Sequence, residues 1–328
     1  MIKTKVLRRR FLGLAAATAT LPLVPRAVRT ETYPARPVHI VVGFAPGGVG
    51  GIVAHLIGQS LQQRLGQPVV VDYRPGAGGT VGAAAVVAAP PDGYALILAS
   101  TINAISGMLY KSLPYDFVRD IAMVAGIMRG PLVMVTNPSF AANSVAELIA
   151  YAKANPGKIN MASAGIGTTS HLAGELFKMM TGIDMLHVPY RGDGPALADL
   201  IAGRTQVMFD NLATAIGFIR DGRLRALAVT TVAPWPALPG IPPVADTVPG
   251  FEAGNWFGIG APKATPSAAI GILNKAINAC DAEPTVANRV RELGAEPMIM
   301  SPSELDAFVV ADTERWASAV NFSGAKVD

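Results

Sequence analysis

From residue 33 onward, short apolar runs alternate with segments whose apolar residues recur at helical spacing. The continuous apolar runs predict strands at 38–44, 68–72, 94–99, 132–135, 159–164, 185–189, 206–209, 224–230 and 256–261. The helical spacing predicts helices at 51–65, 80–89, 142–155, 168–181, 195–202, 213–220, 266–281, 285–293 and 302–320. Because the strands alternate with helices and lack a polar face, the pattern predicts an α/β fold with buried, largely parallel sheets.

The chain has 328 residues, which favours roughly two domains of ~150 residues each. Its residues are 51% hydrophobic and 15% charged, so a sizeable packed core can form and a disordered chain is excluded. A Pro-rich stretch at 233–250 interrupts the alternation and is the expected place for the chain to change domain.

The formal net charge of +4 comes from the first 30 residues. Seven of the 27 basic residues lie there and none of the 23 acidic ones, so the remainder of the chain carries a net charge near −3. This balance gives no support to nucleic-acid binding, which requires a basic patch on the folded part.

Residues 1–30 are predicted to be a signal peptide of the twin-arginine type. Basic residues at 3–10 precede an apolar run at 11–24, which is shorter than the ~20 residues of a membrane span. Arg8, Arg9 and Arg10 stand directly before Phe11 and Leu12, as the paired arginines of twin-arginine signals do. The alternative is a buried N-terminal helix. The cleavage point is left open between 17–19 and 27–31, and the export route predicts a periplasmic protein.

Several kinds of chemistry have no sequence support. A single cysteine, Cys280, excludes an intramolecular disulfide framework and a cysteine zinc cluster. Four histidines without an H-E-x-x-H motif argue against a metal site. The chain has no P-loop, no complete dinucleotide fingerprint and no G-x-S-x-G nucleophile motif, so no cofactor and no catalytic residue is expected.

Two glycine-rich loops each join a predicted strand to a predicted helix, at 44–51 and 163–171. Glycines let backbone N–H groups approach a ligand, and a helix N-terminus attracts an anion. Together the loops form a candidate clamp for a carboxylate or a phosphate; the alternative is that they are plain turns. Asp210 and Asn211 end a strand where open α/β sheets bind ligands, or else cap the next helix.

The order of these motifs resembles that of the tripartite tricarboxylate transporter substrate-binding proteins, also called the Bug receptor family. The resemblance extends from about residue 33 to the C-terminus. The matching segments are YPARPV at 33–38, VVGFAPGG at 41–48, LGQPVVV at 65–71, RPGAGG at 74–79, PDGY at 91–94, PGK at 156–158, ASAGIGT at 162–168, HVPYRG at 187–192, VMFDN at 207–211, LRALAVT at 224–230, WFG at 256–258 and LGAEP at 293–297.

The resemblance implies a type II periplasmic binding protein fold, in which two α/β lobes joined by crossover strands close on a small organic anion. Lobe 1 is expected at 33–130 and 252–328, and lobe 2 at 131–251. The implied protein is a monomeric periplasmic receptor and not an enzyme. It captures a small carboxylate and delivers it to the membrane permease subunits of a tripartite tricarboxylate transporter.

The same resemblance implies a set of ligand-binding residues on two loops, one from each lobe. These residues are Phe44, Ala45, Pro46, Gly47, Gly48, Thr101 and Asn103 from lobe 1, and Ser163, Ala164, Gly165, Gly167, Thr168, His171 and Asp210 from lobe 2.

Position 51 departs from the family pattern, since relatives commonly carry an aspartate where this chain has Gly51 and an arginine where it has His55. The missing acid is either a ligand contact or a helix cap. Its loss removes a partner for an amino group, so a carboxylate without an amine is expected, with more room and less negative charge in the cleft.

Two rival functions are kept. An orphan receptor of the same fold would sense its ligand without transport. An exported α/β hydrolase is the alternative from another class, and it lacks a nucleophile motif.

The signal-peptide interpretation predicts the outcome of replacing Arg9 and Arg10 by lysine. The twin-arginine receptor reads the pair as an address, so the double variant should no longer be exported by that route. Fractionation of cells that express the tagged chain measures this. Full recovery of the variant in the periplasm would assign export to general secretion instead.

Overall fold

The computed structural model describes residues 33–44, 46 and 48–327. The predicted signal peptide and the loop residues Ala45 and Gly47 lie outside the described residues. Pro34–Asp328 form one compact unit. Among the described residues, no helix is long and apolar enough to cross a bilayer.

The strands of this unit form one mixed sheet in the order β2-β1-β3-β9-β4-β7-β5-β6, with β8 and β10 also paired to β4. The strands are β1 (Val38–Val42), β2 (Val69–Tyr73), β3 (Ala95–Ser100), β4 (Ile121–Thr136), β5 (Asn160–Ser163), β6 (Leu186–Pro189), β7 (Val207–Asn211), β8 (Arg225–Val229), β9 (Gly254–Pro262) and β10 (Glu296–Pro297). The predicted parallel pairing occurs on the two flanks, where β1 pairs with β2 and β3, and β5 pairs with β6 and β7. The pairs around β4 and β9 at the centre are antiparallel.

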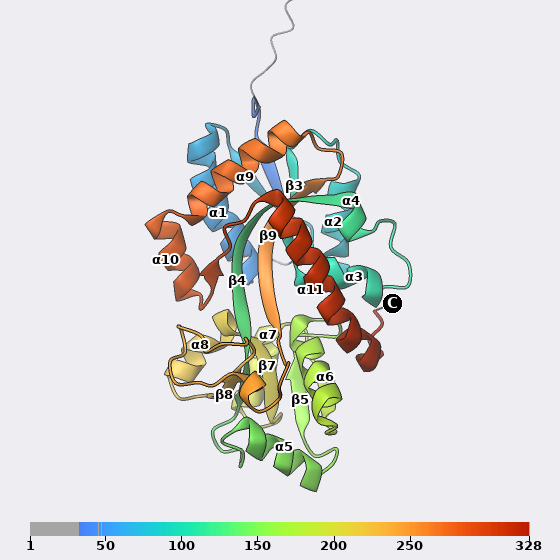
Figure 1. The fold of residues 1–328 in the computed structure, drawn as a ribbon, viewed down its shortest axis with the longest axis vertical. Coiled ribbons are helices and arrows are strands. Elements are labelled where there is room, and N and C mark those ends of the chain that lie inside the picture. The colour runs from blue at the N-terminus through green and yellow to red at the C-terminus, as the bar shows by residue number, and fades with distance from the viewer. Residues whose placement is uncertain (1–32, 45, 47, 328) are drawn as a thin grey trace, which may run out of the picture. The chain divides into compact units, whose positions relative to one another are not determined.

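The long strand β4 divides the sheet into two halves. Residues 121–131 pair with β9, and residues 132–136 pair with β7 and β8. Figure 1 shows β4 and β9 running side by side from one half toward the other. This is the crossover arrangement expected for a type II periplasmic binding protein.

The sequence predicted only residues 132–135 of this strand, because Gly126, Gly130 and Pro131 interrupt the apolar run. The structure shows why a glycine is tolerated there. A Cβ atom on Gly126 would lie 2.3 Å from the carbonyl oxygen of Met298, so the residue that weakens the strand pattern is required by close packing.

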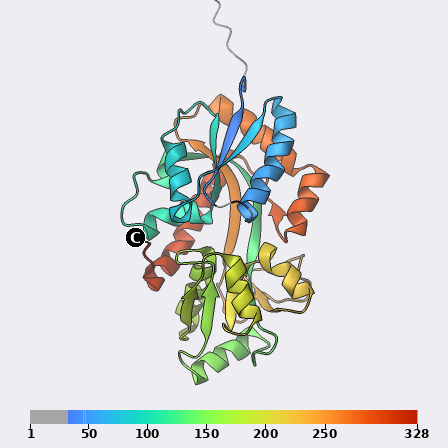
Figure 2. The same ribbon diagram turned by 180° about the vertical axis from the view of Figure 1, so that it is seen from behind.

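The helices cover both faces of the sheet. They are α1 (Val49–Leu65), α2 (Thr80–Val87), α3 (Thr101–Leu109), α4 (Phe117–Asp120), α5 (Val145–Ala154), α6 (Thr169–Thr181), α7 (Asp193–Ile201), α8 (Leu212–Arg220), α9 (Ser267–Asp281), α10 (Pro284–Glu292) and α11 (Pro302–Ser323), with short 3₁₀ turns at Ala77–Gly79 and Val244–Asp246. Figure 2 shows α1 in blue over the first half and the yellow helices α7 and α8 over the second.

The C-terminal helix α11 packs against elements of both halves. It contacts α3 and β4, and its C-terminal part lies beside α6 (Figure 1). Trp316 and Val320 of α11 belong to the same buried cluster as Phe177 of α6 and Phe209 of β7. The burial of these large side chains links the last helix of the chain to the second half of the sheet.

Most predicted helices are present within a few residues of their expected bounds, and α3 and α4 are additions. No helix was predicted from the residues at 100–109, whereas α3 starts directly after β3. Asn103 explains this start, because its Oδ1 accepts hydrogen bonds from the backbone N–H and the hydroxyl of Ser100 at 3.1 and 3.0 Å. This is a capping box with asparagine in place of the usual glutamate.

Asp281 at the end of α9 is a buried carboxyl without a compensating contact. It is 1% exposed, and neither carboxyl oxygen has a hydrogen-bond partner among the described residues. Burial raises the pKa of this group to about 8. The folded state therefore keeps the proton that the unfolded chain releases near pH 4, and stability falls as the pH rises between these values.

We expect Asp281→Asn to stabilise the protein increasingly as the pH rises from 5 to 7.5. The asparagine does not titrate, so its advantage in unfolding free energy should grow by roughly 1 kcal/mol per pH unit. Urea denaturation at the two pH values measures the difference. Asp221→Asn, at an exposed position, is the matched control and should show no such trend. If the unfolding free energies of Asp281→Asn and the wild type changed equally with pH, the raised pKa of Asp281 would be contradicted.

Candidate functional site

The candidate site is a cavity of about 240 Å³ between the two halves of the sheet. Its lining residues come from both halves and are Phe44, Gly48, Val49, Gly50, Ser100, Ile102, Asn255 and Phe257 on one side, and Ala164, Thr168, Thr169, Ser170, Gly192, Asp193 and Asn211 on the other. The volume suits a small organic molecule with a few polar groups.

Five helices begin at this cavity. Their N-cap residues are Gly48 (α1), Ser100 (α3), Thr168 (α6), Gly192 (α7) and Asn211 (α8), and all five line it. Each of these helices follows a strand of a parallel flank, namely β1, β3, β5, β6 and β7. The carboxyl ends of parallel strands meet at one edge of a sheet, so the topology itself brings the helix starts together.

The convergent helix starts make the cavity suited to an anion. The first backbone N–H groups of a helix have no intrahelical partner, and the helix dipole is positive at this end. The caps of α1, α7 and α8 make no side-chain hydrogen bond to their helices. No lysine, arginine or histidine is among the described residues that line the cavity, so the backbone is the source of positive potential.

The structure brings together part of the set predicted from the sequence. Phe44 and Gly48 from the first loop face the same cavity as Ala164 and Thr168 from the second. Pro46 is described, but its neighbours Ala45 and Gly47 are not.

The other predicted residues of the second loop do not line the cavity and instead fix the conformation of the loop. Gly165 and Gly167 have φ angles of 140° and 76°, which only glycine adopts without strain. The hydroxyl of Thr168 donates to the carbonyl of Gly165 at 2.7 Å. Ser163 is fully buried, and its Oγ lies 2.6 Å from Nε2 of His187. The loop conformation is therefore fixed by its own glycines and by side chains beneath it.

His171 belongs to this support and is 4% exposed. Its ring stacks on that of His187, with centroids 3.8 Å apart, and its Nδ1 accepts a hydrogen bond from the backbone N–H of Gly167 at 3.2 Å. Burial lowers the pKa of His171 to about 3 and that of His187 to about 4, so both rings are neutral at ordinary pH. Ser163 and His187 contact each other as a nucleophile and a base would, but the buried serine is not among the lining residues.

Thr101 and Asn103 also lie beneath the cavity and are not among its lining residues. Both are buried; the hydroxyl of Thr101 lies 3.5 Å from Oδ1 of Asn255, and Asn103 caps α3. Asp210 is fully buried and its Oδ2 accepts a hydrogen bond from Thr214 at 2.7 Å. Asp210 is not among the lining residues, but its neighbour Asp193 is, and the charge of Asp193 raises the pKa of Asp210.

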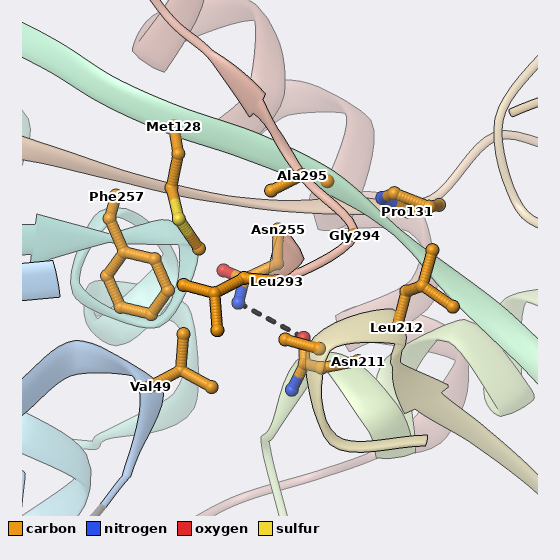
Figure 3. Close-up of a pocket in the computed structure, with 12 residues that line it drawn as sticks. Val49, Met128, Pro131, Asn211, Leu212, Asn255, Phe257, Leu293, Gly294 and Ala295 are labelled. Carbon is orange, nitrogen blue, oxygen red and sulfur yellow. Dashed lines mark hydrogen bonds between the residues drawn. The ribbon is translucent and has the colours of Figure 1, made fainter. Parts of the chain in front are cut away.

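Asn255 lines the cavity but was not predicted from the sequence. Its side chain connects the two halves of the sheet. Its Nδ2 donates to Oδ1 of Asn211 at 3.1 Å. Figure 3 shows this bond in a smaller recess of about 20 Å³ that adjoins the main cavity and shares Val49, Asn211, Asn255 and Phe257 with it. A polar residue at the start of β9, just before Trp256, was the available signal. Nothing local in the sequence pairs it with Asn211.

The structure corrects the expectation that Gly51 gives the ligand more room. A Cβ atom on Gly51 would lie 2.8 Å from the hydroxyl oxygen of Tyr73 on β2. An acid there would point at Tyr73, so the absence of that side chain does not enlarge the cavity. Gly50 does line the cavity, and a Cβ atom on it would lie 3.5 Å from Phe257. The described residues hold no group of three or more His, Cys, Asp or Glu side chains placed to bind a metal ion.

Known proteins resemble this chain along most of its length. BugT of Bordetella pertussis is 37% identical over 319 residues, which cover 96% of this chain and 97% of BugT. The R. palustris protein Rpa4515, solved with adipate, superposes with a TM-score of 0.81 at 37% identity over 89% of this chain and 98% of its own. MatC from Rhodopseudomonas palustris, solved with bound malate, gives a TM-score of 0.78 at 30% identity over 88% and 100% of the two chains.

The sequence profile of the family described as "Tripartite tricarboxylate transporter family receptor" matches residues 53–324. This match covers most of the described unit and both halves of the sheet. The resemblance inferred from the ordered motifs is therefore confirmed, and the chain belongs to the tripartite tricarboxylate transporter family of receptors, which are periplasmic solute-binding proteins.

Proposed function

We propose that the protein is a periplasmic receptor that captures a small carboxylate in the cavity between the two halves of the sheet. The observation that carries this proposal is the convergence of five helix N-termini on a cavity whose described lining contains no cationic side chain. Backbone N–H groups at helix starts bind a carboxylate without a fixed cation. Relatives solved with adipate and malate support a carboxylate as the ligand.

The proposed capture involves closure of two lobes, with boundaries at 33–130 plus 252–328 and at 131–251. The strands β4 and β9 cross between them and are the proposed hinge. Helix starts from both lobes line the cavity, so closure would surround the ligand with donors from both sides. The Asn255–Asn211 hydrogen bond lies between the lobes and would be among the contacts that respond to closure.

The proposed partners are the membrane permease subunits of a tripartite tricarboxylate transporter, and the proposed receptor is a monomer exported by its signal peptide. The family match supports the permease. An orphan sensor of the same fold is the alternative. A permease gene pair beside the gene for this chain would favour transport.

A thermal-shift screen of mono-, di- and tricarboxylates tests the proposed ligand class. We expect at least one acid to raise the unfolding midpoint, and at 100 times its Kd to add about 2.7 kcal/mol to the free energy of unfolding. The diamide of the best acid has a similar shape and no charge, so it should give no shift. If none of the acids raised the unfolding midpoint, the proposed capture of a carboxylate would be contradicted.

The helix-start clamp predicts that proline at a first helical position weakens binding without unfolding the protein. Val49 and Thr169 are the first residues of α1 and α6, and both line the cavity. Proline is tolerated at this position but lacks the N–H donor. Since hydrogen bonds to a charged group contribute ~1.5–3 kcal/mol, Val49→Pro and Thr169→Pro should each weaken binding at least about tenfold.

Isothermal titration with the best acid from the screen measures this loss. Ser267→Pro is the matched control, because Ser267 is the exposed first residue of α9 and is not a lining residue. The unfolding midpoints without ligand should stay close to that of the wild type. Wild-type affinity in both cavity variants would rule out the helix starts as the source of binding.

A further inference from the structure

Asp193 is the one ionisable side chain among the described residues that line the cavity. It is the first residue of α7 and follows the N-cap Gly192, whose φ angle is 110°. The turn after β6 thereby places a carboxyl group at the wall of a cavity that is otherwise surrounded by helix starts. The sequence reasoning looked for an acid at position 51 and did not consider this one.

A second carboxyl group lies behind Asp193. Asp210 is fully buried, and the two carboxyl groups lie close enough for each to influence the pKa of the other. Burial raises the pKa of both, and the charge of Asp193 adds to the rise at Asp210. The rise in pKa is the larger one at Asp210, so Asp210 keeps its proton more readily and Asp193 carries the negative charge at the cavity more readily.

Both carboxyl groups keep an oxygen without a partner. Oδ1 of Asp193 and Oδ1 of Asp210 have no hydrogen-bond partner in the part of the chain that the structure describes. Buried polar atoms normally find partners, and an unpaired one costs free energy. Both atoms are buried, but Asp193 as a residue is half-buried and lines the cavity, so its carboxyl group is an acceptor that a ligand can reach there.

Ser170 provides an independent indication that a polar ligand group belongs here. It is 1% exposed and lines the cavity, and its Oγ also lacks a partner among the described residues. A hydroxyl can donate or accept. Ser170 is the second residue of α6, so it faces the cavity from a different helix than Asp193 does.

A purely structural role for Asp193 is the alternative. An acidic residue in the first turn stabilises a helix through the dipole, and α7 has such a residue in Asp193. That role needs neither a second carboxyl group nearby nor contact with the cavity. It also predicts that replacing Asp193 changes the stability of the protein and leaves its choice among ligands unaltered.

We propose that Asp193, with Ser170, forms a subsite that selects carboxylates carrying a hydrogen-bond-donating group, a hydroxyl or an ammonium. This inference rests on the proposed carboxylate receptor and names its ligand class more closely. The helix starts bind the carboxylate, and the donor group of the ligand meets the carboxyl group of Asp193 at the cavity wall. The glycine at position 51 led us to expect ligands without an amine, and the acid on α7 reverses that expectation.

The test compares acids that differ only in the group on C2. Succinate, malate and aspartate form the four-carbon series; glutarate, 2-hydroxyglutarate and glutamate form the five-carbon series; and adipate, 2-hydroxyadipate and 2-aminoadipate form the six-carbon series. Isothermal titration measures each Kd, with both enantiomers of the substituted acids. In the series that fits the cavity best, at least one donor-bearing acid should bind the wild type about tenfold or more tightly than the unsubstituted acid.

Two variants separate charge from hydrogen bonding. Asp193→Asn keeps an acceptor oxygen and loses the charge, so an amino acid should lose about tenfold in affinity while a hydroxy acid changes less than about threefold. Asp193→Ala removes the acceptor, so the preference for both substituted acids should disappear and the unsubstituted acid should bind as before. Asp221→Asn is an exposed control on α8's C-terminal cap and should leave every Kd unchanged.

Three outcomes would overturn the inference. The first is that the wild type binds the unsubstituted acid as tightly as its substituted partners. The second is that Asp193→Ala weakens the binding of all three acids of a series equally, as a structural role requires, and the third is that Asp193→Ala retains the wild-type preference. Binding of no acid in any series would instead overturn the proposed carboxylate function on which the inference rests. Unfolding midpoints without ligand show that each variant is folded.

Discussion

The convergence of five helix N-termini on one cavity is the constraint on which the rest of the structure depends. Each helix start leaves several N–H groups without partners, and their dipoles repel one another when they point at the same space. In the empty receptor these groups must be hydrated. A bound anion would satisfy many of them at once, which gives a physical reason for carboxylate binding at a cavity whose described lining residues include no cation.

The sheet is built to place these helix starts on opposite sides of the cavity. The parallel flanks, β1 with β3 and β5 with β6 and β7, each end toward it, and the antiparallel strands β4 and β9 connect the two halves. Gly126 allows β4 to pass close to the backbone of Met298, and α11 packs its large side chains into the core of the second half. Continuous strands and a shared helix thus hold both halves in one compact unit.

Buried polar side chains near the cavity hold the loops that line it in place. The stacked pair of His171 and His187 is neutral, because burial makes protonation unfavourable, and it holds the loop of Gly165 and Gly167 through a backbone hydrogen bond. The pair of Asp193 and Asp210 differs, since Asp193 lines the cavity. Within the second half of the sheet, the residues that support the loop are therefore different from the acid that lines the cavity.

The sequence alone determined most of the strands and helices and the two glycine loops, and its ordered motifs carried the resemblance to the family. Local signals suffice for the strands, helices and loops, because apolar runs, helical spacing and glycine act within a few residues. Phe44, Gly48, Ala164 and Thr168 could be predicted as cavity residues for this reason: each lies in a loop between a parallel strand and a helix.

Only the tertiary structure decided the full length of β4, the separation of lining residues from supporting ones, the place of Asp193 and Ser170 at the cavity, and the partner of Asn255. Glycines and Pro131 conceal β4 in the sequence, and close packing explains Gly126. Asn255 meets Asn211 across 44 positions, and Asp193 meets Asp210 from a neighbouring helix start. Such contacts depend on how strands are ordered in the sheet, and this order is set by packing over the whole chain and leaves no trace in the local pattern of residues.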